Sequence, residues 1–164
     1  SSRLQGRRMN DTGYTINGQP ALAKDFYAVA CSPQRHVVVE ACAGAGKTWI
    51  LVARMARAML EGAAPGSLLA ITFTRKAAGE MRGRLFALLA EWAGMDDQAL
   101  TDALQARVVG RVDADLLTRA RALHPQALHA LEGVQIATFH GWFASLLQHA
   151  PLEVLQSLDL PAHA

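Results

Sequence analysis

The sequence contains few charges and few cysteines, and each shortage excludes a class of protein. Charged residues make up 18% of the 164 residues and hydrophobic residues 51%, so the chain is neither a disordered tail nor a coiled coil. Two cysteines, Cys31 and Cys42, are too few for a disulfide-stapled secreted fold, and they form no C-x-x-C pair for zinc or redox chemistry. We therefore expect a domain with its own core in a reducing cytoplasm.

A transmembrane segment is also missing from the sequence. The longest stretch without Asp, Glu, Lys or Arg runs from Gly133 to Leu152, but Gln135, His140 and Pro151 interrupt it. We interpret this stretch as a buried strand followed by a helix, and we predict no membrane contact.

We expect no signal peptide at the N-terminus, because SSRLQGRRMN, residues 1–10, lacks an apolar core. We treat residues 1–20 as a tail, polar enough ahead of Met9 to come in part from an expression vector, and residues 21–164 as the folded part. Residues 35–84 carry eight bases and three acids, whereas residues 85–164 carry four bases and nine acids. The first of these segments could meet a polyanion, although solvated helix faces explain the same asymmetry.

The order of apolar patterns predicts a parallel sheet with helical crossovers. After a short helix from Ala21 to Ala30, a run of three valines begins at Val37 and is typical of a strand covered on both faces. Further strands are expected from Leu68 to Phe73 and from Val134 to Ala137. Strand, turn and helix in repeated order are the signature of an α/β fold.

Helices are expected between and after these strands. The predicted buried stripes are Thr48, Leu51, Met55 and Met59, then Ala78, Met81, Leu85 and Leu88, and finally Phe139, Phe143 and Leu146. Residues 90–132 change character and predict an insertion of two or three short helices. Asp96 would cap one of them, Asp113 or Asp115 would cap the next, and Pro125 would end it.

The segment ACAGAGKT, from Ala41 to Thr48, fits the phosphate-binding loop pattern between a strand and a helix. Gly44 and Gly46 allow the backbone N–H groups to surround phosphate oxygens, and the following helix N-terminus adds positive potential. Lys47 would reach the β- and γ-phosphates of ATP, and the Thr48 hydroxyl would bind Mg²⁺. The alternative is a glycine-rich turn followed by a chance Lys-Thr pair.

Two other segments, from Ala70 to Leu85 and from Val134 to Leu147, each end a strand in Thr-Phe before a helix. Parallel strands would bring both to the same sheet edge as the phosphate loop, where α/β proteins bind ligands. Phe73 or Phe139 could stack on a base of single-stranded nucleic acid, with ordinary core packing as the alternative. The basic residues that could neutralise phosphates nearby are Arg75, Lys76, Arg82 and Arg84.

Taken together, these motifs resemble the UvrD/Rep-like superfamily 1 DNA helicases, and within them the RecB/AddA (exodeoxyribonuclease V beta-like) branch. VEACAGAGKTW resembles the first motif of that family, LLAITFTRKAAGEMRGRL the second, and IATFHGWF the Thr-x-His motif that follows. The resemblance covers Ala21 to Pro151. It implies a P-loop NTPase of RecA-like fold, with a parallel sheet flanked by helices and a helical insertion.

The resemblance also implies a role for individual residues. The residues that would bind ATP and Mg²⁺ are Ala43, Gly44, Ala45, Gly46, Lys47 and Thr48, of which Lys47 and Thr48 would act in catalysis and Thr48 would hold the metal. The residues that would contact single-stranded DNA are Thr72, Phe73, Thr74, Lys76, Thr138 and His140. For His140, a hydrogen bond at the helix start is the alternative. A second helicase–nuclease subunit is a further implied partner.

The sequence departs from the family pattern in two respects. Family members place a glutamine that reads adenine about twenty residues before the loop, whereas alignment brings Asp25 there and leaves Gln19 further upstream. No Asp-Glu pair follows His140, where the family polarises the attacking water, and the transition-state arginines would lie beyond Ala164. We therefore expect an incomplete motor domain, the N-terminal part of an ATP-dependent helicase of recombination or repair, that is inactive alone.

Two other functions remain compatible with a phosphate loop. A small P-loop kinase suits the length, although no arginine-rich lid or acceptor site is evident. A non-catalytic nucleotide-binding module that switches a partner is the second. Phosphorylation of a small molecule would favour the kinase, and nucleotide affinity with no dependence on DNA would favour the module.

Overall fold

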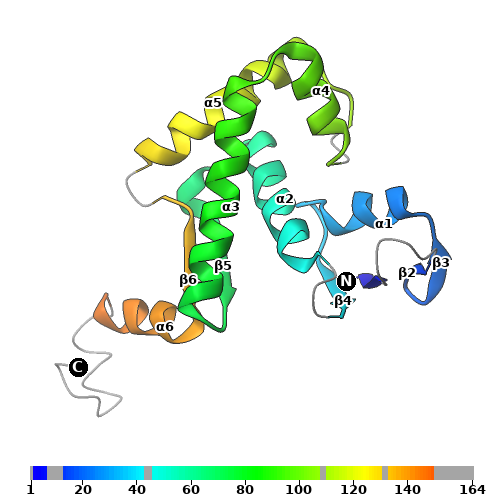
Figure 1. Cartoon of the computed structure of the whole chain (residues 1–164). Coiled ribbons are helices and arrows are strands. Elements are labelled where there is room, and N and C mark those ends of the chain that lie inside the picture. Colours follow the sequence, from blue (N-terminus) through cyan, green and yellow to red (C-terminus); the bar gives the residue numbers. More distant parts are fainter. Residues whose placement is uncertain (1, 7–12, 43–45, 108–109, 131–132, 150–164) are drawn as a thin grey trace.

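The computed structural model describes residues 2–6, 13–42, 46–107, 110–130 and 133–149 (Figure 1). The elements in chain order are β1 (Ser2–Gly6), β2 (Tyr14–Ile16), β3 (Gln19–Ala21), α1 (Ala23–Ala30), β4 (Val37–Ala41), α2 (Lys47–Leu60), η1 (Pro65–Ser67), β5 (Leu69–Thr72), α3 (Arg75–Gly94), α4 (Asp97–Gln105), α5 (Ala114–His129), β6 (Gln135–Thr138) and α6 (Phe139–Gln148). The chain is therefore a mixed α/β protein, as the sequence predicts.

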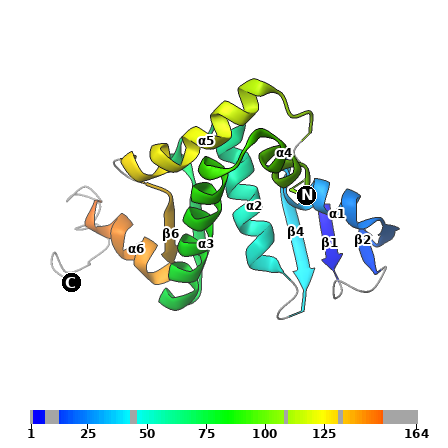
Figure 2. The same ribbon diagram turned by 45° about the horizontal axis from the view of Figure 1, so that its top comes forward.

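The first sheet has the strand order β3-β2-β1-β4. β4 runs parallel to β1, and β1 and β2 are antiparallel (Figure 2). Strand β3 ends at Ala21, so it lies across the predicted boundary between the tail, residues 1–20, and the folded part, residues 21–164. Tyr14 and Phe26 pack with Cys31 and Ile50 beneath this sheet. Arg54 of α2 fastens the end of α1, because its guanidinium donates hydrogen bonds to the carbonyls of Ala30, Ser32 and Arg35.

The second sheet consists of β5 and β6 in parallel register. Helix α3 lies against it, and Arg82 Nη2 donates to the carbonyl of Ile136 at 3.3 Å. The larger core lies between α2, α3, α4 and α5, where burying apolar side chains supplies the main stabilisation. Its most completely buried large side chains are Leu85, Leu89, Trp92, Leu100 and Leu104.

The helix starts confirm several predictions. Asp96 accepts a hydrogen bond from the Ala99 N–H at 2.8 Å, and Asp113 accepts one from Leu116 at 2.9 Å. Asp113, and not Asp115, is therefore the cap of α5. Each cap satisfies an N–H group that would otherwise lack a partner at the first turn. The predicted stripe of α3 is buried throughout, from Ala78 to Leu88.

Four predictions about the elements are wrong. Leu51 is 43% exposed, because the buried face of α2 is rotated toward Ile50 and Ala53. Helix α5 continues through Pro125 to His129. Helix α3 extends to Gly94, beyond the point where the insertion was expected to begin. Helix α6 has no buried residue, so the predicted stripe through Phe139 lies at the surface.

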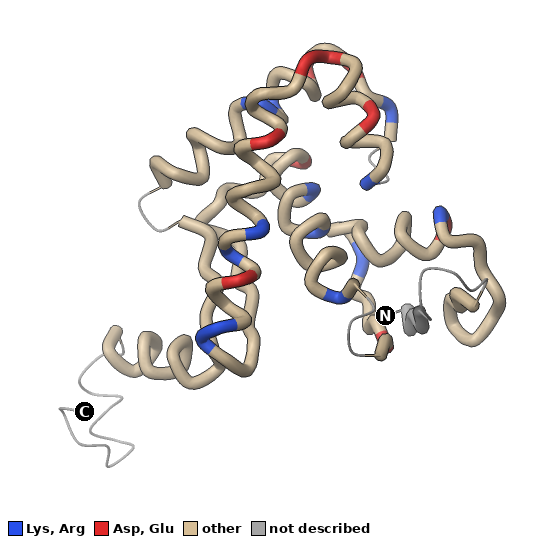
Figure 3. Tube along the Cα trace, in the orientation of Figure 1, with Lys and Arg blue, Asp and Glu red and all other residues tan. Residues whose placement is uncertain are grey.

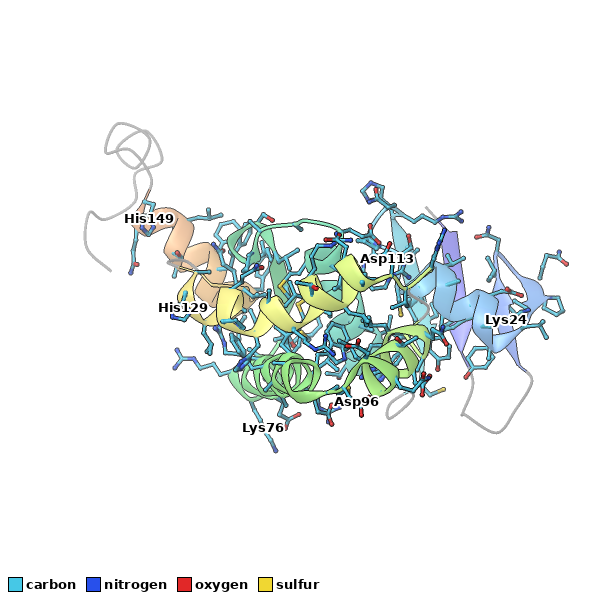
Figure 4. All side chains as sticks on the ribbon, turned by 90° about the horizontal axis from the view of Figure 1, so that it is seen from above. Lys24, Lys76, Asp96, Asp113, His129 and His149 are labelled. Carbon is cyan, nitrogen blue, oxygen red and sulfur yellow. The ribbon has the colours of Figure 1, made fainter. Side chains whose placement is uncertain are left out.

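The prediction of one continuous sheet is also wrong. Within the described part of the chain, β4 pairs only with β1, and β5 pairs only with β6. The first sheet and α1, marked by Lys24, lie at one end of the molecule, and α6, marked by His149, lies at the other (Figure 4). The phosphate-loop segment and the Thr-Phe segments therefore belong to different sheets, joined through α2 and α3.

Candidate nucleotide site and exposed aromatic edge

The candidate phosphate loop connects β4 to α2. Gly46 is the N-cap of α2 and has φ 81°, in the left-handed region that glycine adopts without strain. Among the described residues other than its chain neighbours and the backbone of its own helix, no atom lies within 4 Å of where a Cβ on Gly46 would be. Ala43, Gly44 and Ala45 lie outside the described residues.

The N-terminus of α2 carries no side-chain cap and no acidic residue in its first turn. By contrast, Thr74, Asp96, Asp113 and Thr138 cap α3, α4, α5 and α6. The N–H groups at the start of a 14-residue helix attract an anion, and the first turn of this helix contains no acidic residue that would repel one. This end of α2 therefore fits phosphate.

Lys47, at the first position of α2, reaches back to the end of β4. Its Nζ donates to the carbonyl of Ala41 at 2.6 Å and to that of Cys42 at 2.8 Å. The ammonium group thus lies beside the end of β4, on an exposed side chain. Thr48, the predicted Mg²⁺ ligand, follows it and is partly exposed. Among the described residues, no cluster of three or more His, Cys, Asp or Glu side chains could hold a metal.

The second sheet brings the two Thr-Phe segments together. Thr72 and Thr138 are directly paired across β5 and β6, so the chains leave the sheet side by side. Phe73 is 95% exposed and Phe139 is 51% exposed. Phe73 is therefore not a core residue in this structure, whereas Phe139 is half-buried, with its ring centroid 5.4 Å from that of Phe143. Both aromatic side chains are accessible to solvent where the strands end.

The predicted DNA contacts around this edge have local roles as well. Thr74 accepts a hydrogen bond from the Ala77 N–H, and Thr138 accepts one from Gly141, both at 3.1 Å. Thr138, and not His140, therefore provides the hydrogen bond at the start of α6. His140 is exposed, with its ring centroid 6.1 Å from that of Phe139.

The basic residues of α3 extend from this edge (Figure 3). Arg75 and Lys76 lie exposed in its first turn, two and three residues after Phe73. Acidic residues gather instead around α4, at the other end of α3. Basic residues lie at that end as well, where Arg121 pairs with Asp97 and Arg119 pairs with Asp115.

The candidate adenine residues are separate from these groups. Gln19 is exposed in β3, and Asp25 is exposed in the first turn of α1. Neither side chain approaches the loop through an interaction that the structure shows. His129 and His149, for which the sequence indicated no ligand role, each bond a carbonyl four residues earlier in their own helices.

Sequence reasoning missed an aromatic cluster at the start of α2. Trp49, directly after Thr48, makes an edge-to-face contact with Tyr27, with ring centroids 5.3 Å apart. Arg107 lies over the Trp49 ring, with Cζ 5.9 Å from the centroid. Only the position of Trp49 beside the motif could have drawn attention to it, because its partners are distant in sequence.

Comparisons with known proteins identify the family. The profile of the UvrD/REP helicase N-terminal domain matches residues 23–157. The chain is 48% identical over 67 residues to DNA helicase II of Escherichia coli (strain K12), which covers 40% of this chain and 9% of that protein. It is 33% identical over 96 residues to an ATP-dependent helicase/nuclease subunit of Latilactobacillus sakei subsp. sakei (strain 23K). This match covers 58% of this chain and 10% of that protein.

A third relative is the ATP-dependent DNA helicase UvrD2 of Mycobacterium tuberculosis (strain ATCC 25618 / H37Rv), 50% identical over 58 residues, 35% of this chain and 8% of that protein. No solved structure matches the chain. The match defines an N-terminal helicase-type domain, and the chain belongs to the UvrD/REP helicase N-terminal domain family. The resemblance inferred from the motifs is confirmed, with relatives of both the UvrD and the helicase/nuclease kinds.

Proposed function

We propose that this chain is the N-terminal ATP-binding portion of an ATP-dependent DNA helicase or translocase of recombination or DNA repair. The intact protein would couple ATP hydrolysis to movement along single-stranded DNA. The observation that carries the proposal is the uncapped start of α2, where Gly46 is left-handed and the Lys47 ammonium group lies beside the end of β4. Membership of the helicase family supports ATP as the nucleotide and DNA as the polyanion.

The proposed roles at the nucleotide follow from this geometry. The N–H groups at the head of α2, with Ala43, Gly44 and Ala45 in the loop, would hold the phosphates. Lys47 would exchange its two carbonyl partners for phosphate oxygens, and the Thr48 hydroxyl would face the metal. A bound Mg²⁺ would neutralise charge that builds on the phosphates. Gln19 remains the candidate for adenine.

The fold proposal is a RecA-like P-loop domain. Two features support it: the strand–loop–helix unit of β4 and α2, and the parallel pairing of β5 with β6 behind α3. Helices α4 and α5 correspond to the helical insertion proposed for residues 90–132. Residues 21–164 would then be the N-terminal part of the ATP-binding domain.

The proposed DNA track follows the edge of the second sheet. Phe73 would stack on a base, because its ring is almost wholly exposed beside the basic first turn of α3. The other residues proposed to contact the strand are Thr72, Thr74, Lys76, Thr138 and His140. A second helicase–nuclease subunit remains a proposed partner, supported by the helicase/nuclease relatives, which are named as subunits.

A cytoplasmic location is proposed as well, supported by the two cysteines, which are both free thiols in the structure. Among the described residues, no helix is both long and apolar enough to cross a bilayer.

A hydrolysis assay tests the catalytic part of the proposal. The 164-residue chain would be mixed with ATP, Mg²⁺ and single-stranded DNA, and phosphate release followed over time. We expect nucleotide binding without steady turnover, because hydrolysis needs metal, positioned water and an arginine together. Sustained DNA-stimulated release would contradict the expected inactivity, and a phosphorylated small molecule would favour a P-loop kinase instead.

A further inference from the structure

Trp49 occupies an unusual position for a large aromatic residue. It is the third residue of α2, directly after the proposed phosphate and metal ligands Lys47 and Thr48. Its ring is 37% exposed, so it is not a simple core residue. One edge meets Tyr27 of α1, and the Arg107 guanidinium lies over its face.

Arg107 links this ring to the helical layer. It follows the end of α4, where its N–H donates to the Leu104 carbonyl at 3.1 Å and its Nη1 donates to the Ala103 carbonyl at 3.0 Å. Its Cζ lies 5.9 Å from the Trp49 centroid and 5.6 Å from that of Trp92 in α3. A guanidinium within about 6 Å of a ring centroid is attracted to the ring. One cation therefore joins α2, α3 and the end of α4.

The guanidinium of Arg107 lies in a partly buried environment, which strengthens its contact with the aromatic rings. Burial lowers the pKa of its guanidinium from the ordinary value, while Glu91 and Cys31 oppose that shift. The side chain lines a cavity of about 230 Å³ with Trp49, Arg84 and Glu91. A desolvated cation gains more from two aromatic faces than an exposed one does.

We propose that Arg107 is a positioning residue of the nucleotide site, which holds Trp49 and thereby couples ATP binding at the loop to the docking of α4. This inference rests on the proposed function. A bound nucleotide orders the first turn of α2 and thereby fixes Trp49. Through its contact with Trp49, Arg107 is fixed as well, and with it the end of α4. Because coupling between two sites is reciprocal, a loosened α4 weakens nucleotide binding by the same factor.

The test measures ATP·Mg²⁺ affinity of the 164-residue chain by calorimetry, together with amide hydrogen exchange over residues 97–105. We expect ATP to slow exchange in α4 of the wild type. Arg107→Met should abolish that slowing and weaken ATP binding about two- to fivefold, the affinity equivalent of one cation–π contact. Arg107→Lys keeps the charge and should recover most of the affinity.

Arg119→Met is the matched control. Arg119 ties α5 to the end of α2, since its Nη1 donates to the Leu60 carbonyl at 2.9 Å, but it makes no contact with α4 or Trp49 that the structure shows. It should lower stability without changing ATP affinity. Should Arg107→Met fail to fold, Trp49→Leu removes the same contact from a partly exposed position.

The outcomes separate the inference from the function on which it rests. Equal ATP affinity in wild type, Arg107→Met and Trp49→Leu, with α4 exchange indifferent to ATP, overturns the coupling and leaves nucleotide binding intact. Equal weakening by Arg119→Met also overturns it, because the effect would then be general destabilisation. A wild-type chain that binds no nucleotide overturns both proposals.

Discussion

At the scale of single residues, the exposed ring of Phe73 makes the clearest prediction about DNA. Its side chain is 95% exposed and packs on nothing that would need it for stability. Phe73→Ala should weaken binding of a labelled single strand by about 1–3 kcal/mol, the usual contribution of one stacked base. Fluorescence anisotropy measures the affinity, and urea denaturation should show an unchanged midpoint.

Phe86→Ala in α3 is the control for the Phe73 substitution. Phe86 is partly buried against the larger core, so its loss should lower the urea midpoint and leave DNA affinity nearly unchanged. Equal DNA affinity in the wild type and Phe73→Ala would exclude a stacking role for that ring.

Tyr27 makes a prediction about pH. Burial, and then the hydrogen bond with Tyr14, raise the pKa of Tyr27 from 10.0 to about 12. The unfolded chain therefore ionises first, so the stabilising contribution is complete below pH 10 and is lost as pH rises toward 12. Urea midpoints should fall over that window in the wild type and fall less in Tyr27→Phe. An identical decline in both proteins would contradict this role.

Residue-scale features were predictable where they depend on local chemistry. The caps at Asp96 and Asp113 follow from side chains that reach an N–H group three residues ahead. The contact of Trp49 with Arg107 was not predictable, because the two residues are far apart in sequence and no periodic pattern links them.

At the scale of elements, the start of α5 tests how much one cap contributes. Asp113→Ala leaves the Leu116 N–H without its acceptor and should lower the free energy of unfolding by about 1 kcal/mol. Asp115→Ala is the matched control, since Asp115 makes only an exposed ion pair with Arg119 at 3.1 Å and should cost roughly 0–0.5 kcal/mol. Equal losses in the two variants would show that charge, and not capping, stabilises this end.

Element types were predictable, whereas their ends and faces were less so. Proline usually ends a helix, so Pro125 was expected to end this one, yet α5 continues to His129. Its buried residues Leu123 and Ala127 lie on either side of Pro125, so core packing compensates for the lost hydrogen bond. The exposed stripe of α6 was not predictable, because periodicity shows that a face is apolar but not what covers it.

At the scale of the whole molecule, the separation of the two sheets has a consequence for association. In the described part of the structure, β4 and β5 each have one edge without a paired strand. Leu69 and Ile71 of β5 are 45% and 42% exposed, and Val38 of β4 is 53% exposed. Apolar strand edges pair readily with other chains.

We therefore predict concentration-dependent self-association, measured by multi-angle light scattering. Ile71→Lys places a charge beside the free edge of β5 and should shift the protein toward monomer. Leu128→Lys changes an equally apolar, 58% exposed position on α5 and should have no such effect. A wild-type chain that remains a strict monomer at all concentrations would contradict the prediction.

The global arrangement was the least predictable level. The sequence indicated the parallel strands β5 and β6 and the crossover helices correctly, because these depend on short apolar runs and helix periods, but it did not indicate the antiparallel strands β1, β2 and β3. It could not indicate which strands pair, since pairing depends on contacts between distant segments. The sequence predicted one sheet edge that carries all the ligand-binding segments, whereas the structure divides them between two sheets. The candidate phosphate loop follows β4, and the two phenylalanines follow β5 and β6.

The central claim is that the start of α2 binds the phosphates of ATP, and a calorimetric titration of the 164-residue chain with ATP·Mg²⁺ tests it most directly. The account predicts saturable binding at one site in the wild type and its loss in Lys47→Ala, with an unchanged circular dichroism spectrum, because the Lys47 side chain is exposed. Absence of binding in the wild type, or undiminished binding in Lys47→Ala, would contradict it.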